Sequence, residues 1–231
     1  MTDRPRNTGP DMKAVLFDMD GTLLDSEKVW DIALADLARW LGGELSESAR
    51  TRMVGSSLAR SIAILHADLD IDADPETSGH YLLTRTEALF HTSLVWKPGA
   101  EKLLAAVRDA ALPAALVTST HRRLTEVALD VIGRQYFAVT VCGDEVGHPK
   151  PHPEPYLKAV GLLGLAASDC LVIEDSPLGI ASAEAAGAAV LAIPSEVDIE
   201  PASRRVIRNS LQAMTVEDLR QVFRALRQPS P

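Results

Sequence analysis

The 231-residue chain has few cysteines, few aromatic residues and no long hydrophobic run. Its two cysteines, Cys142 and Cys170, lie in or beside apolar segments, which favours buried, reduced thiols over a disulfide scaffold. No apolar run approaches the roughly 20 residues that a membrane-spanning helix needs. The polar segment 1–10 also lacks the apolar stretch of a secretory signal. We therefore expect a cytoplasmic protein with no membrane partner.

The chain also lacks an excess of basic residues, because 23 Lys and Arg stand against 32 Asp and Glu, a formal net charge of −9. A negative field disfavours nucleic acid as a partner. An anionic substrate requires a metal ion or a well-placed lysine to reverse the sign locally. Hydrophobic residues make up 46% of the chain and charged residues 24%, which excludes a disordered or fibrous protein. We expect a globular protein, and a monomer by default.

Short apolar runs alternate along the chain with helical patterns. Between these runs, apolar residues recur at positions i, i+3, i+4 and i+7, as they do on one face of a helix. Strands that alternate with helices indicate βαβ units and a parallel sheet covered on both faces. The pattern therefore predicts an α/β fold, with strands at residues 13–17, 114–117, 138–142, 170–173 and 189–193.

One long stretch after the first predicted strand contains no convincing strand. Apolar residues at helical spacing instead predict helices around 30–41, 58–65 and 81–90. The simplest account is a Rossmann-like core with an inserted helical cap domain that covers the carboxyl ends of the strands. The predicted divisions are a disordered extension at 1–11, a core at 12–25 and 95–231, and a cap at 26–94.

Two aspartates, Asp18 and Asp20, follow the first predicted strand. Alternate residues of an extended chain point the same way, so both carboxylates can project into one crevice. Two such carboxylates repel each other unless a cation holds them. Gly21 then permits a sharp turn whose backbone N–H groups can face an anion. The alternative interpretation is an ordinary Asp-Gly turn.

Further polar residues follow the later strands. Thr118 and Ser119 offer an anion site at a helix start. The alternative is plain helix capping by Thr120 or Ser119. Lys150 lies among alternating prolines that hold it in place, unless the segment is an exposed polyproline stretch. Glu174 and Asp175 form another carboxylate pair, or simple acids at a helix N-terminus. Because every group lies at the carboxyl end of a strand, the set favours one active site over independent accidents.

Together these segments resemble the haloacid dehalogenase superfamily of hydrolases, over essentially the whole chain after residue 12. The DxDGT motif of that superfamily matches 18–22, and Thr118, Lys150 and 174–175 match its other motifs. The helical insertion is similar to the small cap of the phosphoglycolate phosphatase and β-phosphoglucomutase-like branch. Dehalogenases proper carry a single Asp in place of the pair, so Asp20 favours phosphate chemistry.

The resemblance implies a role for each acidic residue. Asp18 would attack phosphorus and form an aspartyl-phosphate, and Asp20 would act as general acid and then general base. Mg²⁺ would be bound by Asp18, the backbone carbonyl of Asp20 and the carboxylate of Asp175. Glu174 would support the site without contacting the ion.

The phosphate group itself would be bound by Thr118, Ser119 and Lys150. The implied activity is Mg²⁺-dependent hydrolysis of a small phosphate ester of a sugar, polyol or similar metabolite.

A phosphosugar mutase of the β-phosphoglucomutase type is the alternative enzyme. The mutases carry a cap His and a cap Arg, where this sequence has Trp30 and Leu58. A bisphosphate intermediate needs cations at both ends, and Arg60 or Lys28 would have to supply the missing one. Trp30 and Arg60 are the candidate substrate contacts from the cap, and the alternative for Trp30 is packing on the face of the cap helix. A non-catalytic module that keeps the fold is disfavoured by the intact set of motif residues.

Overall fold

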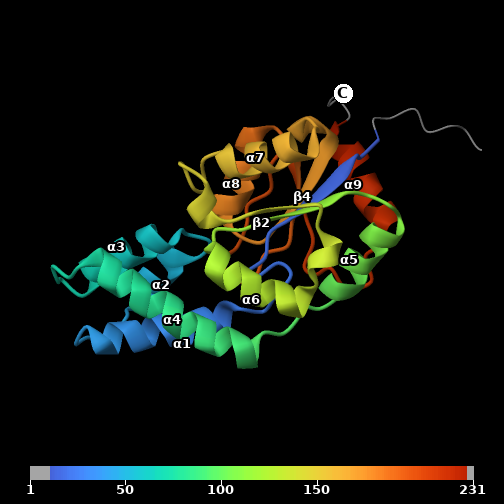
Figure 1. Cartoon of the computed structure of the whole chain (residues 1–231). Coiled ribbons are helices and arrows are strands. Elements are labelled where there is room, and N and C mark those ends of the chain that lie inside the picture. The colour runs from blue at the N-terminus through green and yellow to red at the C-terminus, as the bar shows by residue number, and fades with distance from the viewer. Residues whose placement is uncertain (1–10, 228–231) are drawn as a thin grey trace, which may run out of the picture.

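The structure is a computed structural model that describes residues 11–227 (Figure 1). The extension expected at residues 1–11 lies, apart from Asp11, outside the described residues. None of the described helices is long and apolar enough to cross a membrane. The cytoplasmic location and the monomeric state stay predictions.

A six-stranded sheet in the order β3-β2-β1-β4-β5-β6 forms the centre of the fold. Every neighbouring pair is parallel. This arrangement confirms the α/β class with a Rossmann-like sheet. The strands are β1 (Ala14–Phe17), β2 (Ala114–Val117), β3 (Val139–Val141), β4 (Cys170–Glu174), β5 (Ala189–Ala192) and β6 (Arg205–Ile207).

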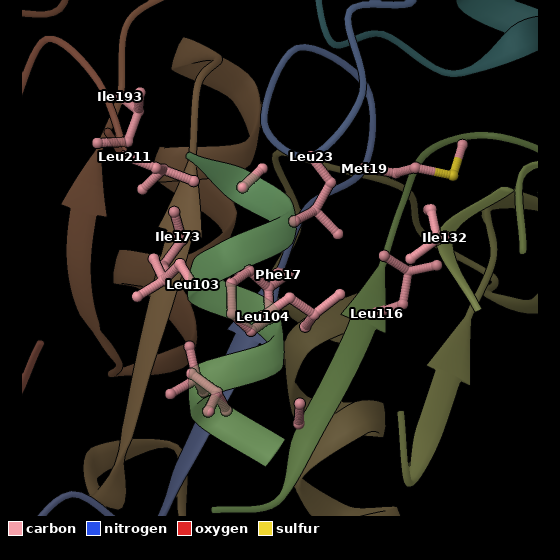
Figure 2. Close-up of a cluster of buried hydrophobic side chains, with 14 of the residues drawn as sticks. Phe17, Met19, Leu23, Leu103, Leu104, Leu116, Ile132, Ile173, Ile193 and Leu211 are labelled. Atoms are coloured by element: carbon pink, nitrogen blue, oxygen red, sulfur yellow. The ribbon is translucent and has the colours of Figure 1, made fainter. Parts of the chain in front are cut away.

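Helices cover both faces of the sheet, as the alternating pattern predicts. On one face Phe17, Leu116 and Ile173 pack against Leu103 and Leu104, as Figure 2 shows. The neighbouring strand residues point to the opposite face, because successive side chains of a strand alternate. The first face is covered by α5 (Ala100–Asp109), α6 (Arg122–Ile132) and α9 (Val216–Arg227), and the second by α7 (Glu154–Leu163) and α8 (Pro177–Ala186).

Four further helices follow β1 and lie to one side of the sheet (Figure 1). Their apolar faces share a separate cluster of buried residues that includes Leu37, Ile62 and Leu82. A Ser or Asp side chain caps the N-terminus of three of them by accepting a backbone N–H. These cap helices are α1 (Glu27–Trp40), α2 (Glu47–Met53), α3 (Leu58–Asp68) and α4 (Pro75–Ser93).

The connection between β1 and α1 places the cap beside the carboxyl edge of the sheet. The chain enters α1 shortly after the carboxyl end of β1, which is the edge where open α/β sheets bind ligands. Three short 3₁₀ helices complete the described chain, namely η1 (Arg134–Tyr136), η2 (Gly143–Glu145) and η3 (Ala167–Asp169).

Candidate active site

A cavity lies between the cap and the carboxyl edge of the sheet. Seven of the nine side chains singled out in the sequence line it, and they come from segments far apart in the chain. From the core these are Asp18, Asp20, Thr118, Ser119, Lys150 and Asp175, and from the cap Trp30.

Lys150 places a positive charge among the buried acids and is only 4% exposed. Its Nζ donates to Oδ1 of Asp18 at 2.7 Å, to Oε1 of Glu174 at 2.7 Å and to the carbonyl oxygen of Val117 at 2.9 Å. Burial alone would lower the pKa of Lys150, but the charges of Asp18 and Glu174 outweigh it and raise that pKa. The lysine therefore stays charged and fixes one oxygen of Asp18.

Asp18, Glu174 and Asp175 form a buried acidic cluster whose ligand oxygens lie within 4.8 Å of one another. Burial, and then the neighbouring carboxylates, raise the pKa of Asp175 well above its usual range. Burial likewise raises the pKa of Asp18, although Lys150 opposes the shift. Three carboxylates with one lysine form a site short of positive charge.

Glu174 differs from the other two acids because its oxygens are already occupied. Oε1 accepts from Lys150 and from the hydroxyl of Tyr156 at 2.8 Å, and Oε2 accepts from Oγ of Ser176 at 3.1 Å and from two backbone N–H groups. Among the described residues, no hydrogen-bond donor reaches the carboxylate of Asp175. The buried oxygens of Asp18 and Asp175 therefore fit a hard divalent cation such as Mg²⁺, which prefers oxygen ligands.

Asp20 is held by donors from both the core and the cap. Its Oδ1 accepts from Oγ of Ser26 at 2.6 Å and from Nε1 of Trp30 at 3.0 Å. Its Oδ2 accepts from Oγ1 of Thr120 at 2.7 Å and more weakly from Oγ1 of Thr118 at 3.4 Å. Both oxygens of this carboxyl group are therefore fixed in direction.

Two of these donors, Ser26 and Thr120, are absent from the predicted site. The sequence suggested helix capping for the hydroxyls after β2, but α6 begins after His121, which leaves Thr120 free to bond Asp20. The sequence feature that indicates Thr120 as a site residue is its place just after a strand. Ser26 gave no signal, because its contact depends on the turn that follows β1.

The cap contributes an arginine other than the expected one. Arg60 is exposed on α3 and does not line the cavity, whereas Arg50 on α2 does. Arg50 is bonded to Asp31 and, at 2.7 Å, to Glu196 of the core. Beside it the cap lining is largely apolar, with Leu34, Met53, Val54, Leu58, Leu82 and Leu83.

A Rossmann-like sheet that presents buried acids and one buried lysine to a helical cap is the architecture of an α/β enzyme. The chain belongs to the haloacid dehalogenase-like hydrolase family, whose model matches residues 12–187. This result confirms the predicted family and the prediction of an enzyme. The roles of the individual site residues stay predictions.

Two similar proteins support the same family assignment. Hexitol phosphatase A of Escherichia coli (strain K12) is 33% identical over 217 residues, which cover 88% of this chain and 94% of that protein. The phosphorylated carbohydrates phosphatase of Thermotoga maritima is 33% identical over 180 residues, which cover 76% of this chain and 82% of that protein.

A solved structure shows the same fold. The crystal structure of CbbY from Rhodobacter sphaeroides in complex with phosphate has a TM-score of 0.80 at 22% identity and covers 90% of this chain and 99% of that one. At this identity the likeness supports the fold alone. A β-phosphoglucomutase structure from Clostridium difficile, with a TM-score of 0.80 at 19% identity, covers 92% of this chain and 97% of that one.

Proposed function

We propose that the protein is a Mg²⁺-dependent phosphatase that hydrolyses a small phosphorylated sugar, polyol or similar monoester through an aspartyl-phosphate on Asp18. One observation carries the proposal. A buried carboxylate, fixed through one oxygen by Lys150, shares a cavity with a second carboxyl group, Asp20, that four donors hold in place. The relatives named as phosphatases of hexitols and phosphorylated carbohydrates support the substrate class.

Asp18 supplies the nucleophile in this proposal. Lys150 binds Oδ1, so Oδ2 is the oxygen that attacks phosphorus as the bond between phosphorus and the alcohol oxygen breaks. The same lysine offsets part of the repulsion between the nucleophile and an anionic substrate. Its position depends on Glu174, which accepts from Lys150 and from Tyr156.

Asp20 transfers the protons. In the first step it donates a proton to the departing alkoxide, which leaves as the alcohol. In the second step it takes a proton from a water molecule that attacks the aspartyl-phosphate, so that inorganic phosphate is released and Asp18 is restored. Thr118 and Ser119 line the cavity beside these acids and are placed to bind phosphoryl oxygens.

In this proposal Mg²⁺ binds at the two acids whose carboxylate oxygens accept too few hydrogen bonds. Asp18 and Asp175 would hold Mg²⁺, together with the backbone carbonyl of Asp20. When bound, it would offset the negative charge of the carboxylates and of the phosphoryl oxygens. Glu174 is left to position Lys150, because its own oxygens are already occupied.

The cap favours hydrolysis over mutase chemistry. A bisphosphate intermediate requires a cation at the end far from Asp18. Within the described chain, the cap arginine that lines the cavity, Arg50, is already paired with Asp31 and Glu196, and Arg60 points to solvent. The cap end therefore suits an uncharged leaving group better than a second phosphate.

A phosphate-release screen tests the proposal. The panel contains hexitol and other polyol phosphates, sugar phosphates, nucleotides and phosphoglycolate, each with Mg²⁺ and with a chelator. We expect release from one or a few monoesters, only with Mg²⁺, and none from the Asp18→Asn variant. Release that survives that substitution would remove Asp18 as the nucleophile. Conversion of glucose 1-phosphate to glucose 6-phosphate with a catalytic bisphosphate, and without free phosphate, would favour the mutase.

A further inference from the structure

A second cluster of possible metal ligands lies on the segment that carries Lys150. His148, His152 and Glu154 each offer one ligand atom, and these atoms lie within 4.8 Å of one another. Both histidines are exposed and neither lines the active-site cavity. The cluster is therefore separate from the buried acids around Asp18.

The three side chains are already arranged around one another. Nδ1 of His148 lies 2.8 Å from Oε2 of Glu154, and the rings of His148 and His152 are 4.6 Å apart between centroids. Oε1 of Glu154 accepts from the backbone N–H of Gly147 at 2.7 Å, and Oε2 accepts from that of His148 at 2.9 Å. These backbone hydrogen bonds fix the direction of the carboxylate. Carboxylates that ligate metals are commonly held by hydrogen bonds in this way.

The backbone beneath the cluster is restrained. Pro149, Pro151 and Pro153 alternate with the residues that carry the polar side chains and fix φ at each of their positions. The N–H of His152 donates to the carbonyl oxygen of Pro149 at 3.0 Å, and Oγ of Ser182 donates to the carbonyl oxygen of His152 at 2.6 Å. Little conformational freedom is lost when a ligand binds to such a segment.

The chemistry of the donors selects the ion. Two imidazoles and one carboxylate suit Zn²⁺ and its neighbours Co²⁺, Ni²⁺ and Cu²⁺, whereas Mg²⁺ prefers oxygen ligands alone. We propose that His148, His152 and Glu154 form a binding site for a divalent transition-metal ion of the Zn²⁺ class. Three protein ligands leave a coordination position for water, as in zinc sites that are open to solvent.

A bound ion would join the two flanks of Lys150. His148 precedes this lysine by two residues and His152 follows it by two. The site therefore fastens the outside of the segment whose inward side chain holds Asp18 and Glu174. Because the ion binds the folded chain in preference to the unfolded one, it raises the temperature of unfolding.

Calorimetric titration of the tag-free full chain with Zn²⁺ tests the proposal. Excess Mg²⁺ is present throughout, so that the buried acids are occupied. We expect one binding event, with Zn²⁺ affinity at least about tenfold lower in the variants His148→Ala, His152→Ala and Glu154→Gln. Loss of a residue that only hydrogen-bonds to a metal ligand already lowers affinity by about this factor. His91→Ala is the matched control, because His91 is exposed on α4 in the cap, and it should bind Zn²⁺ as the wild type does.

A second measurement separates ligation from general stabilisation. Zn²⁺ should shift the imidazole NMR signals of His148 and His152 but not that of His91, and should raise the unfolding temperature of wild type and His91→Ala but not of His148→Ala. Equal Zn²⁺ affinity in wild type and the three cluster variants would overturn the proposal, as would the absence of binding to the wild type.

Discussion

The indole Nε1 of Trp30 donates a 3.0 Å hydrogen bond to Oδ1 of Asp20. Trp30 lies on α1 of the cap, whereas Asp20 follows β1 of the core. An edge-on contact with Phe90 of α4, with ring centroids 6.2 Å apart, holds the indole in place. The position of the cap therefore contributes, together with Thr120 of the core, to the direction of the carboxyl group that we propose as the acid.

The Trp30→Phe variant should retain the ring packing and lose the donor. A hydrogen bond contributes about 0.5–1.5 kcal/mol, and Ser26 and Thr120 still hold the carboxyl group. We expect kcat to fall about tenfold, equivalent to about 1.4 kcal/mol, with KM little changed. Steady-state kinetics on a monoester found in the screen checks this.

The control for that variant is Trp40→Phe. Trp40 is 52% exposed on the same helix and stacks on Tyr81, away from the cavity lining. Its kcat should equal that of the wild type. A Trp30→Phe enzyme as fast as the Trp40→Phe enzyme would show that the indole N–H does not position Asp20.

Lys150→Met should cause a large loss of stability. The substitution leaves Asp18 and Glu174 buried without their shared cation, and breaking a buried ion pair in this way costs about 3–5 kcal/mol. Lys13→Met is the control, since its ion pair with Asp169 is exposed to solvent and contributes little to stability. Urea denaturation of both variants gives the comparison. A Lys150→Met protein as stable as the Lys13→Met protein would contradict the buried network.

Asp175→Asn should make the Mg²⁺-free protein more stable while it removes the response to Mg²⁺. The folded pKa values of Asp175 and Asp18 are raised, so at intermediate pH the folded chain binds more protons than the unfolded chain. Stability without Mg²⁺ therefore falls as pH rises above about 4, the ordinary carboxyl value, towards the raised folded values. The substitution should add about 1–2 kcal/mol at neutral pH and flatten this dependence.

Thermal unfolding with and without Mg²⁺ measures both effects. One kcal/mol corresponds to about 2–4 °C for a chain of this size. Mg²⁺ should raise the melting temperature of the wild type and leave that of Asp175→Asn unchanged. Asp109→Asn, at an exposed position on α5, should respond to Mg²⁺ as the wild type does. A full Mg²⁺ response in Asp175→Asn would place the ion elsewhere.

The central strands were predictable because each is a continuous apolar run buried on both faces. The edge strand Arg205–Ile207 was missed, since three half-buried residues give no such run. Helix α2 was missed as well, because within its polar sequence only Ala49 and Met53 are buried. Its N-cap, Ser46, and its packing on the other cap helices stabilise it, and packing of that kind is not local in sequence.

The same distinction applies to the site. Asp18 and Asp175 could be recognised because acidic residues at the ends of apolar segments stand out in a sequence, and Lys150 because prolines alternate around it. Arg50 was not found, because its place in the cavity depends on how α2 lies against the core loop that carries Glu196. Contacts between cap and core depend on the relative placement of distant segments, which local patterns do not encode.

Gly55, in the loop between α2 and α3, is one point of close approach between cap and core. Its φ is +67°, and a Cβ there would lie 2.5 Å from Oγ and 2.6 Å from Cβ of Ser176 in the core. Ser176 is buried and bonded to Glu174 and to the N–H of Gly179, so it has little room to move. Oγ of Ser119 also donates to the carbonyl oxygen of Gly55 at 3.3 Å. The loop between α2 and α3 therefore rests directly on Ser176 and Ser119 of the core.

Gly55→Ala should consequently displace the cap as well as strain the backbone. Gly42 supplies the control, since its φ is +91° and a Cβ there would meet nothing within 4 Å. Both variants should lose about 1–2 kcal/mol of stability, because an alanine is strained at positive φ. Only Gly55→Ala should also lose activity, about 10- to 100-fold in kcat/KM, the effect of a shift of about 1 Å in an active site. Equal kcat/KM in the two variants would mean that the contact between Gly55 and Ser176 does not set the position of the cap over the site.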